Sequence, residues 1–425
     1  MATIISRDGT KIKIEVEVDI SGSMFEMENK ILNACNEVGL VATEQAIESF
    51  DTDGSEIKIG DVKYTVNTLS NKDYETPYGK IPIKRYLYQT SKGGKTYIPL
   101  EVNARIVNGA TPRFAKILSS KYANMQGSGV LDDLQESHDR HVSLQYVQNV
   151  AEAVSVIADV KEELWEYSIP EIKNKITSIG ISLDGAHVGM KNEGYRETMA
   201  GTISLYDKNG DRHHTIYIGA SPEYGKAKFY QRLTQEIVKV KKLYPSCSYI
   251  GVADGSKGNW NFLQQHTTNQ ILDFYHATEY LSEASELFIN VITRKNWLDD
   301  ACHKLKHDEG GAFTILTNLK SLLKDPAKKF TKAVKEKLQS AITYFENNLL
   351  RMNYAHNTTL KLPIGSGVVE AACKTLIKQR CCNSGMRWKE SGLKVVLSLR
   401  GLVRTKGRWS QFWSKINQYG VPAAV

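Results

Sequence analysis

The sequence is short of cysteine and of long apolar segments. It has six cysteines in 425 residues, none spaced as a C-x-x-C pair, which argues against a disulfide framework and against a zinc ribbon. No apolar run approaches the ~18 residues of a membrane span. Residues 1–10 lack the basic-then-apolar pattern of a secretion signal. We therefore expect a reduced, cytoplasmic protein with no membrane segment.

The overall composition is that of a folded globular chain. Hydrophobic residues make up 41% of the sequence and charged residues 24%, which excludes disordered and fibrous proteins. The sequence contains no internal repeat and no low-complexity segment. A chain of 425 residues is long enough for two to four domains.

The positive charge of the chain is concentrated near one end. The net charge is +8, but residues 361–425 carry twelve Lys and Arg against two Glu, a local charge of +10. The other 360 residues sum to −2, and residues 1–60 alone carry −7. Basic density interleaved with aromatic residues is what binding to a polyanion requires. The alternative is a solvated helical face with no ligand.

Residues 103–170 have the pattern of a helical module. Thr111-Pro112 is a helix start, a second helix is expected near 130–136, and a third begins around Ser143. One side of the third helix is apolar, and its other side carries three amides: Gln145, Gln148 and Asn149. A final helix that presents amides outward is typical of a helix-turn-helix, because Asn and Gln can pair with adenine edges. An ordinary helical bundle is the alternative.

From residue 177 onward strands and helices are mixed. Their expected order is β-β-β-α-β-α-β-α, with the first three strands as a meander, which is the order of a ribonuclease H-like core. Two apolar strands, 179–183 and 248–253, are expected to end at Asp184-Gly185 and Asp254-Gly255. Residues 295–360 are Lys-rich and helical in pattern, so they are interpreted as an insertion.

Three acidic residues are candidates for a catalytic site. Cleaving or joining a phosphodiester uses two divalent cations about 3.5–4 Å apart, and Mg²⁺ prefers carboxylate ligands. Asp184 and Asp254 would lie at the ends of adjacent strands, and Glu370 would lie in the first turn of a late helix. Lys374 and Lys378 follow Glu370 at i+4 and i+8 on the same helical face. The alternatives are two structural Asp-Gly turns and a surface Glu–Lys pair.

Five motifs in order resemble a known family, the insertion-sequence transposases of the ISKra family, over roughly residues 60–415. They are Ser182-Leu183-Asp184-Gly185, Val252-Ala253-Asp254-Gly255, Asp273-Phe274-Tyr275-His276, Gly365-Ser366-Gly367-Val368-Val369-Glu370 and Gly385-Met386-Arg387-Trp388. The ISKra transposases that the chain resembles are prokaryotic DDE transposases with a ribonuclease H-like catalytic domain.

The resemblance implies that Asp184, Asp254 and Glu370 are the catalytic residues and bind Mg²⁺ or Mn²⁺. It implies that Asp273 and His276 support the metal ligands or contact DNA, and that residues 295–360 are the helical insertion that precedes the catalytic glutamate. Members of that family often carry paired cysteines in the segment that matches residues 86–94. This chain has none there, so we expect a zinc-free β module.

These observations predict an α/β fold with a ribonuclease H-like mixed-sheet core and an all-helical insertion, preceded by a small β-hairpin module and a helix-turn-helix-like module. The predicted segments are an acidic N-terminal segment (1–60), a small β module (61–102), the helix-turn-helix-like module (103–170), the catalytic core (171–294 with 361–402), the insertion (295–360) and a basic aromatic tail (403–425).

The predicted function is DNA transposition: cleavage at the ends of a mobile element and joining of the 3′-hydroxyls to target DNA. The partners would be double-stranded DNA and a second or further copies of the chain in the prokaryotic nucleoid. The residues expected to contact DNA are Gln145, Gln148, Asn149, Lys374, Lys378, Arg387, Trp388, Arg404 and Arg408. A ribonuclease H-like nuclease or resolvase without strand transfer and a catalytically silent DNA-binding protein are the alternatives.

The charge pattern makes a first prediction. Replacing Lys374, Lys378 and Arg387 together by Gln should flatten the salt dependence of DNA binding, because each lost phosphate contact lowers the slope of log K against log [salt] by about 0.9. Fluorescence anisotropy over a salt series measures the slope. A matched triple variant, Lys11→Gln, Lys13→Gln and Lys30→Gln, should leave it unchanged. An unchanged slope in the first variant would make the basic segment a structural feature.

Overall fold

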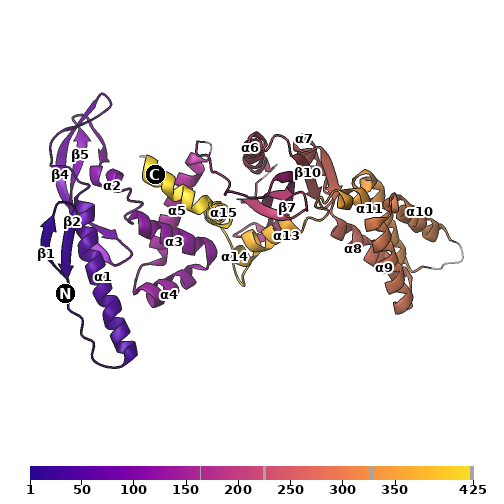
Figure 1. Ribbon diagram of the computed structural model, residues 1–425, viewed down its shortest axis with the longest axis horizontal. Helices are drawn as coiled ribbons and strands as arrows, with labels where there is room; N and C mark the ends of the chain where they lie inside the picture. Colours follow the sequence, from indigo (N-terminus) through magenta and orange to yellow (C-terminus); the bar gives the residue numbers. More distant parts are fainter. Residues whose placement is uncertain (163, 224–225, 326–329, 422–425) are drawn as a thin grey trace. The chain divides into compact units, whose positions relative to one another are not determined.

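The computed structural model describes residues 1–162, 164–223, 226–325 and 330–421. The chain forms two compact units (Figure 1). The first contains Met1–Tyr167 together with Arg408–Val425, and the second contains Ser168–Gly407. None of the helices in the described ranges is both long and apolar enough to cross a membrane.

The first unit begins with a hairpin, a long helix and a twisted sheet. The hairpin strands are β1 (Thr3–Asp8) and β2 (Lys11–Glu15), and the helix is α1 (Met24–Glu48). Ser23 and Glu26 form a reciprocal capping box at the start of α1. The antiparallel sheet has the order β3 (Ile57–Ile59), β4 (Val62–Glu75), β5 (Lys80–Thr90) and β6 (Gly93–Tyr97). This sheet overlaps the β module predicted for residues 61–102, but it begins earlier, at Ile57, and ends at Tyr97, because residues 99–103 are helical.

Helices follow the sheet within the same unit: α2 (Pro99–Asn103), α3 (Pro112–Asn124), α4 (Gly127–His138) and α5 (Leu144–Lys161). Pro112 is the first residue of α3, as predicted, but the Thr111 hydroxyl makes no capping hydrogen bond. Ser143 does cap α5, because its side chain accepts a hydrogen bond from the Tyr146 N–H. The apolar stripe predicted for α5 is buried, including Val147, Val150 and Val154.

The last helix of the chain, α16 (Arg408–Tyr419), belongs to this first unit. Phe412 and Trp413 are buried, and the ring of Trp165 meets Phe412 edge-on at 5.7 Å between centroids. The predicted basic aromatic tail, 403–425, is divided between the units: residues 403–407, with the end of α15 (Glu390–Arg404), belong to the second unit, and Arg408 onward belongs to the first. Residues 422–425 of that predicted tail lie outside the described residues.

The second unit is built on a five-stranded mixed sheet with the order β11-β10-β7-β8-β9. β7 (Ile176–Met190), β8 (Gly194–Asp207) and β9 (Arg212–Ala220) form an antiparallel meander. β10 (Ser248–Ala253) and β11 (Asn269–Leu272) are parallel to β7. The predicted strand 179–183 was too short: it does not end at Asp184, because β8 pairs with β7 as far as Met190.

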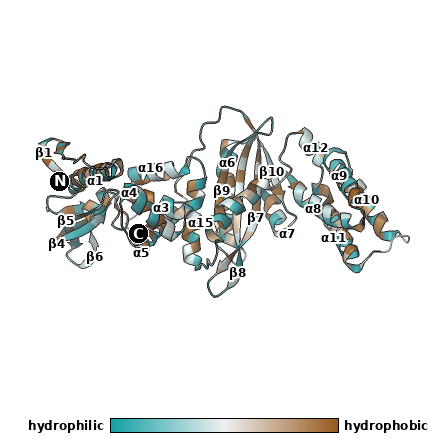
Figure 2. Ribbon diagram, turned by 90° about the horizontal axis from the view of Figure 1, so that it is seen from below, coloured by the Kyte–Doolittle hydropathy of each residue, from teal (hydrophilic) through white to brown (hydrophobic). Residues whose placement is uncertain are grey.

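Two layers of helices cover this sheet, and two glycines show which helix lies on which face. A Cβ on Gly201 would touch Phe229 and Leu233 of α6 (Ala227–Leu243), whereas one on Gly219 would touch Leu376 and Leu397. Gly219 pairs with Ala200, the neighbour of Gly201, so the two glycines face opposite sides. Helix α6 therefore covers one face, and α15 and residues 373–378 cover the other. Figure 2 shows hydrophobic residues along the strands between them.

The remaining helices of the second unit form a bundle beside the sheet (Figure 1). Every element in the described part of the predicted insertion, 295–360, is helical, and its core is continuous with that of the sheet. Helix α7 (Lys257–His266) follows β10, and the bundle contains α8 (Phe274–Ala284), α9 (Val291–His307), α10 (Gly311–Lys324), α11 (Lys332–Asn348), α12 (Tyr354–Thr359) and the 3₁₀ turns Ser285–Leu287 and Leu349–Arg351.

A helix interrupted by a wider turn completes the second unit. It consists of α13 (Gly367–Ala372), a π-helical turn over Cys373–Lys378 and α14 (Gln379–Cys381). The unit is mixed α/β, and the order of its strands with α6, α7 and α8 is the order expected from the sequence.

The position of α16 leads to a prediction for stability. Phe412→Ala should destabilise the first unit by about 3–5 kcal/mol, the usual cost of removing a buried aromatic side chain. Thermal unfolding should show the loss, and hydrogen exchange should speed up at the Trp165 N–H, which donates to the Lys161 carbonyl beside the altered site. Gln418→Ala, on the exposed side of the same helix, is the matched control and should change neither. Unaltered exchange of the Trp165 N–H after Phe412→Ala would contradict the packing described here.

Candidate active site

The three predicted acids line a single cavity of the second unit. Asp184, Asp254 and Glu370 all contribute to its wall, and its volume is about 800 Å³. The other lining residues are His276, Gly367, Ala371, Cys373, Lys374, Lys378 and Gln379. The cavity wall therefore combines residues of β7, of the turn after β10, of α8 and of the interrupted helix that begins with α13.

Asp184 and Asp254 are brought together by strand pairing. β10 runs parallel to β7, with Val252 opposite Ser182. Continuing this register by two residues places Asp254 opposite Asp184, on strand paths about 4.8 Å apart. The two carboxylates therefore lie where β10 has ended and β7 continues.

The turn after β10 fixes the conformation of Asp254. Gly255 has φ +103°, a conformation that side chains other than glycine rarely adopt. The Asp254 carboxylate accepts hydrogen bonds from the Ser256 N–H at 3.1 Å and the Asn259 side-chain amide at 3.2 Å. The Tyr344 hydroxyl, from α11 of the helical bundle, donates to the Asp254 main-chain oxygen at 2.8 Å.

Glu370 is held less tightly, in the first turn of α13. Its Oε1 accepts a hydrogen bond from the Ser366 hydroxyl at 2.6 Å. The start of α13 is in turn fixed by Asp273, whose carboxylate accepts the Ser366 N–H at 2.5 Å and caps α8 through the His276 N–H. Asp273 is fully buried. Its carboxylate therefore positions the start of the Glu370 helix, whereas His276 lines the cavity.

The cavity concentrates negative charge. Burial raises the pKa of Asp184, and the neighbouring Asp254 raises it further, although hydrogen bonds from the Gly185 N–H and the Cys373 thiol oppose the shift. Burial by itself would lower the pKa of His276, but the carboxylates of Asp273, Glu279 and Glu370 outweigh it and raise that pKa. A cation in the cavity would relieve the repulsion between the two aspartates.

The chemistry of these side chains fits a hard divalent cation, since carboxylate oxygens are the ligands that Mg²⁺ prefers. Asp184, Asp254 and Glu370 would hold it. Within the described residues, however, no three His, Cys, Asp or Glu side chains are gathered closely enough to hold a metal ion. Asp184 lies in β7 and Asp254 directly follows the neighbouring strand β10, whereas Glu370 is engaged by Ser366.

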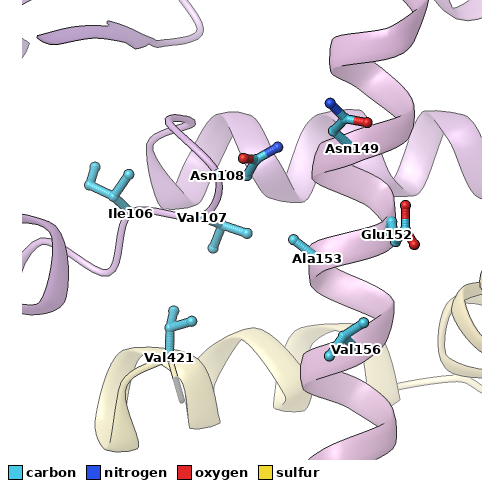
Figure 3. Close-up of a pocket in the computed structure, with 8 residues that line it drawn as sticks. All are labelled: Ile106, Val107, Asn108, Asn149, Glu152, Ala153, Val156 and Val421. Atoms are coloured by element: carbon cyan, nitrogen blue, oxygen red, sulfur yellow. The ribbon is translucent and has the colours of Figure 1, made fainter. Parts of the chain in front are cut away.

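The amides predicted to read DNA lie in the first unit, on α5. The Gln145 side chain donates to the Asn149 side-chain oxygen at 2.7 Å, and both residues are exposed. Gln148 is half-buried. Asn149 and Glu152 are among the α5 residues that line a pocket of about 420 Å³, which is also lined by the loop with Val107 and Asn108 and by Val421 (Figure 3).

The other predicted DNA contacts have diverse surroundings. Lys374 and Lys378 line the cavity with the acids. Arg387 lies over the ring of Tyr195 at 5.2 Å, and Trp388 is tied to the end of β7 by main-chain bonds with Gly189 and Lys191. Arg404 is exposed at the end of α15, and Arg408, in the first unit, lies over Tyr167 at 5.3 Å.

The sequence did not predict a role in the site for Asn259, Cys373 or Tyr344. Asn259 bridges the two aspartate strands, because its amide also donates to the Leu183 main-chain oxygen at 3.4 Å. Cys373 donates to Asp184, and its spacing of three residues from Glu370 could have indicated a shared helical face. Tyr344 lies 90 residues from Asp254 in sequence, and no local pattern indicates this contact.

The comparisons with known proteins identify no relative. No protein-family model matches this sequence, and no curated protein is significantly similar to it.

The raised pKa of Asp184 predicts how stability depends on pH. The folded state holds the Asp184 proton more tightly than the unfolded state, so this carboxyl favours folding below its ordinary pKa of 3.8 and loses that contribution as pH rises through its folded pKa. In metal-free buffer, Asp184→Asn should therefore raise the melting temperature at pH 7, and the gain should shrink toward pH 3. Asp211→Asn, at an exposed site, is the control. A variant no more stable than the wild type at pH 7 would contradict this.

Proposed function

We propose that the chain is a DDE transposase of the ISKra type, with a ribonuclease H-like catalytic unit and a DNA-reading first unit. The observation that carries the proposal is the single cavity that Asp184, Asp254 and Glu370 line, together with Lys374 and Lys378. The parallel register that sets the two aspartates side by side supports it. The mixed sheet, with three antiparallel strands followed by two parallel ones, supports the fold assignment.

The proposed reaction is phosphoryl transfer at a DNA phosphodiester. Two bound Mg²⁺ or Mn²⁺ ions would activate the attacking oxygen and stabilise the leaving oxygen. Asp184 and Asp254 supply a rigid pair of ligands, and Glu370 supplies a third once its carboxylate leaves the Ser366 hydroxyl. Lys374 and Lys378 bind the phosphates flanking the scissile bond by charge attraction.

The two steps of transposition use the same residues. In the first, a water molecule attacks the phosphodiester at the element end and frees a 3′-hydroxyl. In the second, that hydroxyl attacks a phosphodiester of the target DNA. His276 lines the cavity and carries a raised pKa, so it can donate a proton to a phosphate oxygen or a leaving oxygen. Because two element ends must be joined to one target, we propose that the active form has at least two copies.

A strand-transfer assay tests the proposal. Protein is incubated with a duplex that carries an element end and with a target plasmid, with Mg²⁺ or with chelator. Joined products should form only with Mg²⁺ and should fall by at least about a hundredfold in Glu370→Gln and in Asp254→Asn, since each removes a ligand of the reaction centre. Glu283→Gln, which removes an exposed carboxylate on α8 that does not line the cavity, is the control for charge loss nearby.

The outcomes separate the alternatives. Metal-dependent cleavage without joining would favour a ribonuclease H-like nuclease or resolvase. DNA binding with neither cleavage nor joining, unchanged in Asp184→Ala, would indicate a silent DNA-binding protein.

A further inference from the structure

The helix that carries Glu370 contains an unusual turn directly after the glutamate. Cys373–Lys378 form a π-helical turn, in which the Gln379 N–H donates to the Lys374 carbonyl five residues back. Such turns are rare and cost hydrogen-bond geometry, so they persist where surrounding structure holds them. The turn begins three residues after Glu370, within the wall of the cavity.

The π turn changes which side chains share a face. In a regular α-helix a residue four positions later is displaced by about 40° around the axis, so Lys378 would drift well away from Glu370. A turn with more residues per revolution reduces this drift. In the structure Glu370, Lys374 and Lys378 all line the cavity, and Cys373 donates to Asp184 from the same segment.

A buried arginine holds this turn. Arg400 of α15 is only 1% exposed. Its Nε donates to the Leu376 carbonyl at 2.7 Å, and its Nη2 donates to the Thr375 carbonyl. Burial lowers the pKa of Arg400 to about 10, so the guanidinium is still charged at pH 7. Helix α15 packs on β9, and Arg400 thereby links the π turn to the sheet.

We propose that Arg400 is a positioning residue for the reaction assigned above: by binding the carbonyls of the π turn it holds Glu370, Lys374 and Lys378 on one side of the cavity and Cys373 against Asp184. The inference rests on the proposed function for its catalytic consequence. Its structural part, the locking of the turn, stands on the contacts alone. Two parallel donors of a planar guanidinium suit two successive carbonyls, whereas the ammonium of lysine is a single point donor.

The test compares full-length Arg400→Lys and Arg400→Met with the wild type. Lys242→Met, which removes one exposed positive charge at the end of α6, is the control. Peptide mapping after iodoacetamide treatment measures labelling of Cys373, which is 4% exposed. Labelling should speed up at least about tenfold in both Arg400 variants, because unpaired buried carbonyls favour local opening. The control should match the wild type.

Catalysis supplies the second readout. A displacement of about 1 Å of reacting groups costs on the order of a hundredfold in rate, so kcat for DNA-end cleavage should fall by about that factor. KM for DNA should rise by a much smaller factor than kcat falls, because Lys374 and Lys378 supply only part of the phosphate contacts. Arg400→Lys should retain more activity than Arg400→Met.

Each outcome bears on the proposal. Faster Cys373 labelling with unchanged kcat would leave Arg400 a purely structural residue and overturn the positioning role. Unchanged labelling in a folded variant would overturn the lock itself. If the wild type shows no metal-dependent cleavage, the proposed function fails, while the labelling result still decides whether Arg400 holds the turn. If both variants unfold, hydrogen exchange of the wild type decides: residues 373–378 should exchange no faster than α15, and faster exchange would refute the lock.

Discussion

The parallel pairing of β10 with β7 is the constraint on which the candidate site depends. Asp184 lies within a strand that is longer than its parallel neighbour, and Asp254 lies just past the end of that neighbour. The backbone hydrogen bonds of the sheet thus hold two carboxylates side by side against their mutual repulsion. Burial and this repulsion both raise the pKa of Asp184, and the cation proposed for the cavity would offset the repulsion.

Hydrogen bonds between residues far apart in the sequence stabilise the cavity that the three acids line. Asp273, at the start of α8, binds the main chain at Ser366. Tyr344 reaches from the helical bundle to the main chain of Asp254 and stacks on Tyr280 at 3.9 Å. The segment that looked like an insertion in the sequence therefore shares its hydrophobic core and a hydrogen bond with the acidic cavity. Its removal would leave the Asp254 carbonyl without this donor.

The sequence predicted the parts of the molecule that depend on local pattern. Alternating and continuous apolar runs indicated most strands of the four-stranded and five-stranded sheets but not β3, and Ser143 indicated the start of α5. Asp184 and Asp254 were found because each follows a buried apolar run. The end of β7 was misplaced because the pattern cannot show that β8 continues to pair beyond Asp184. The π turn depends on Arg400, and no local sequence pattern indicates that contact. The position of α16 in the first unit depends on Trp165, which lies far from α16 in the sequence.

The three acidic residues of the site are held in two ways: Asp184 and Asp254 by the sheet and the turn after β10, and Glu370 by a short helix. Asp184 lies on a paired strand, and Asp254 lies in the turn that directly follows β10, where the Ser256 N–H and the Asn259 amide hold its carboxylate. Glu370 sits on a helical turn of six residues whose start depends on the Asp273–Ser366 bond. Its carboxylate already has a partner in the Ser366 hydroxyl, which satisfies it in the absence of metal. A small rotation of the Glu370 side chain would let it leave the Ser366 hydroxyl and bind the proposed cation with little change of the fold. This requires that the π turn over residues 373–378, which follows Glu370, stays in place.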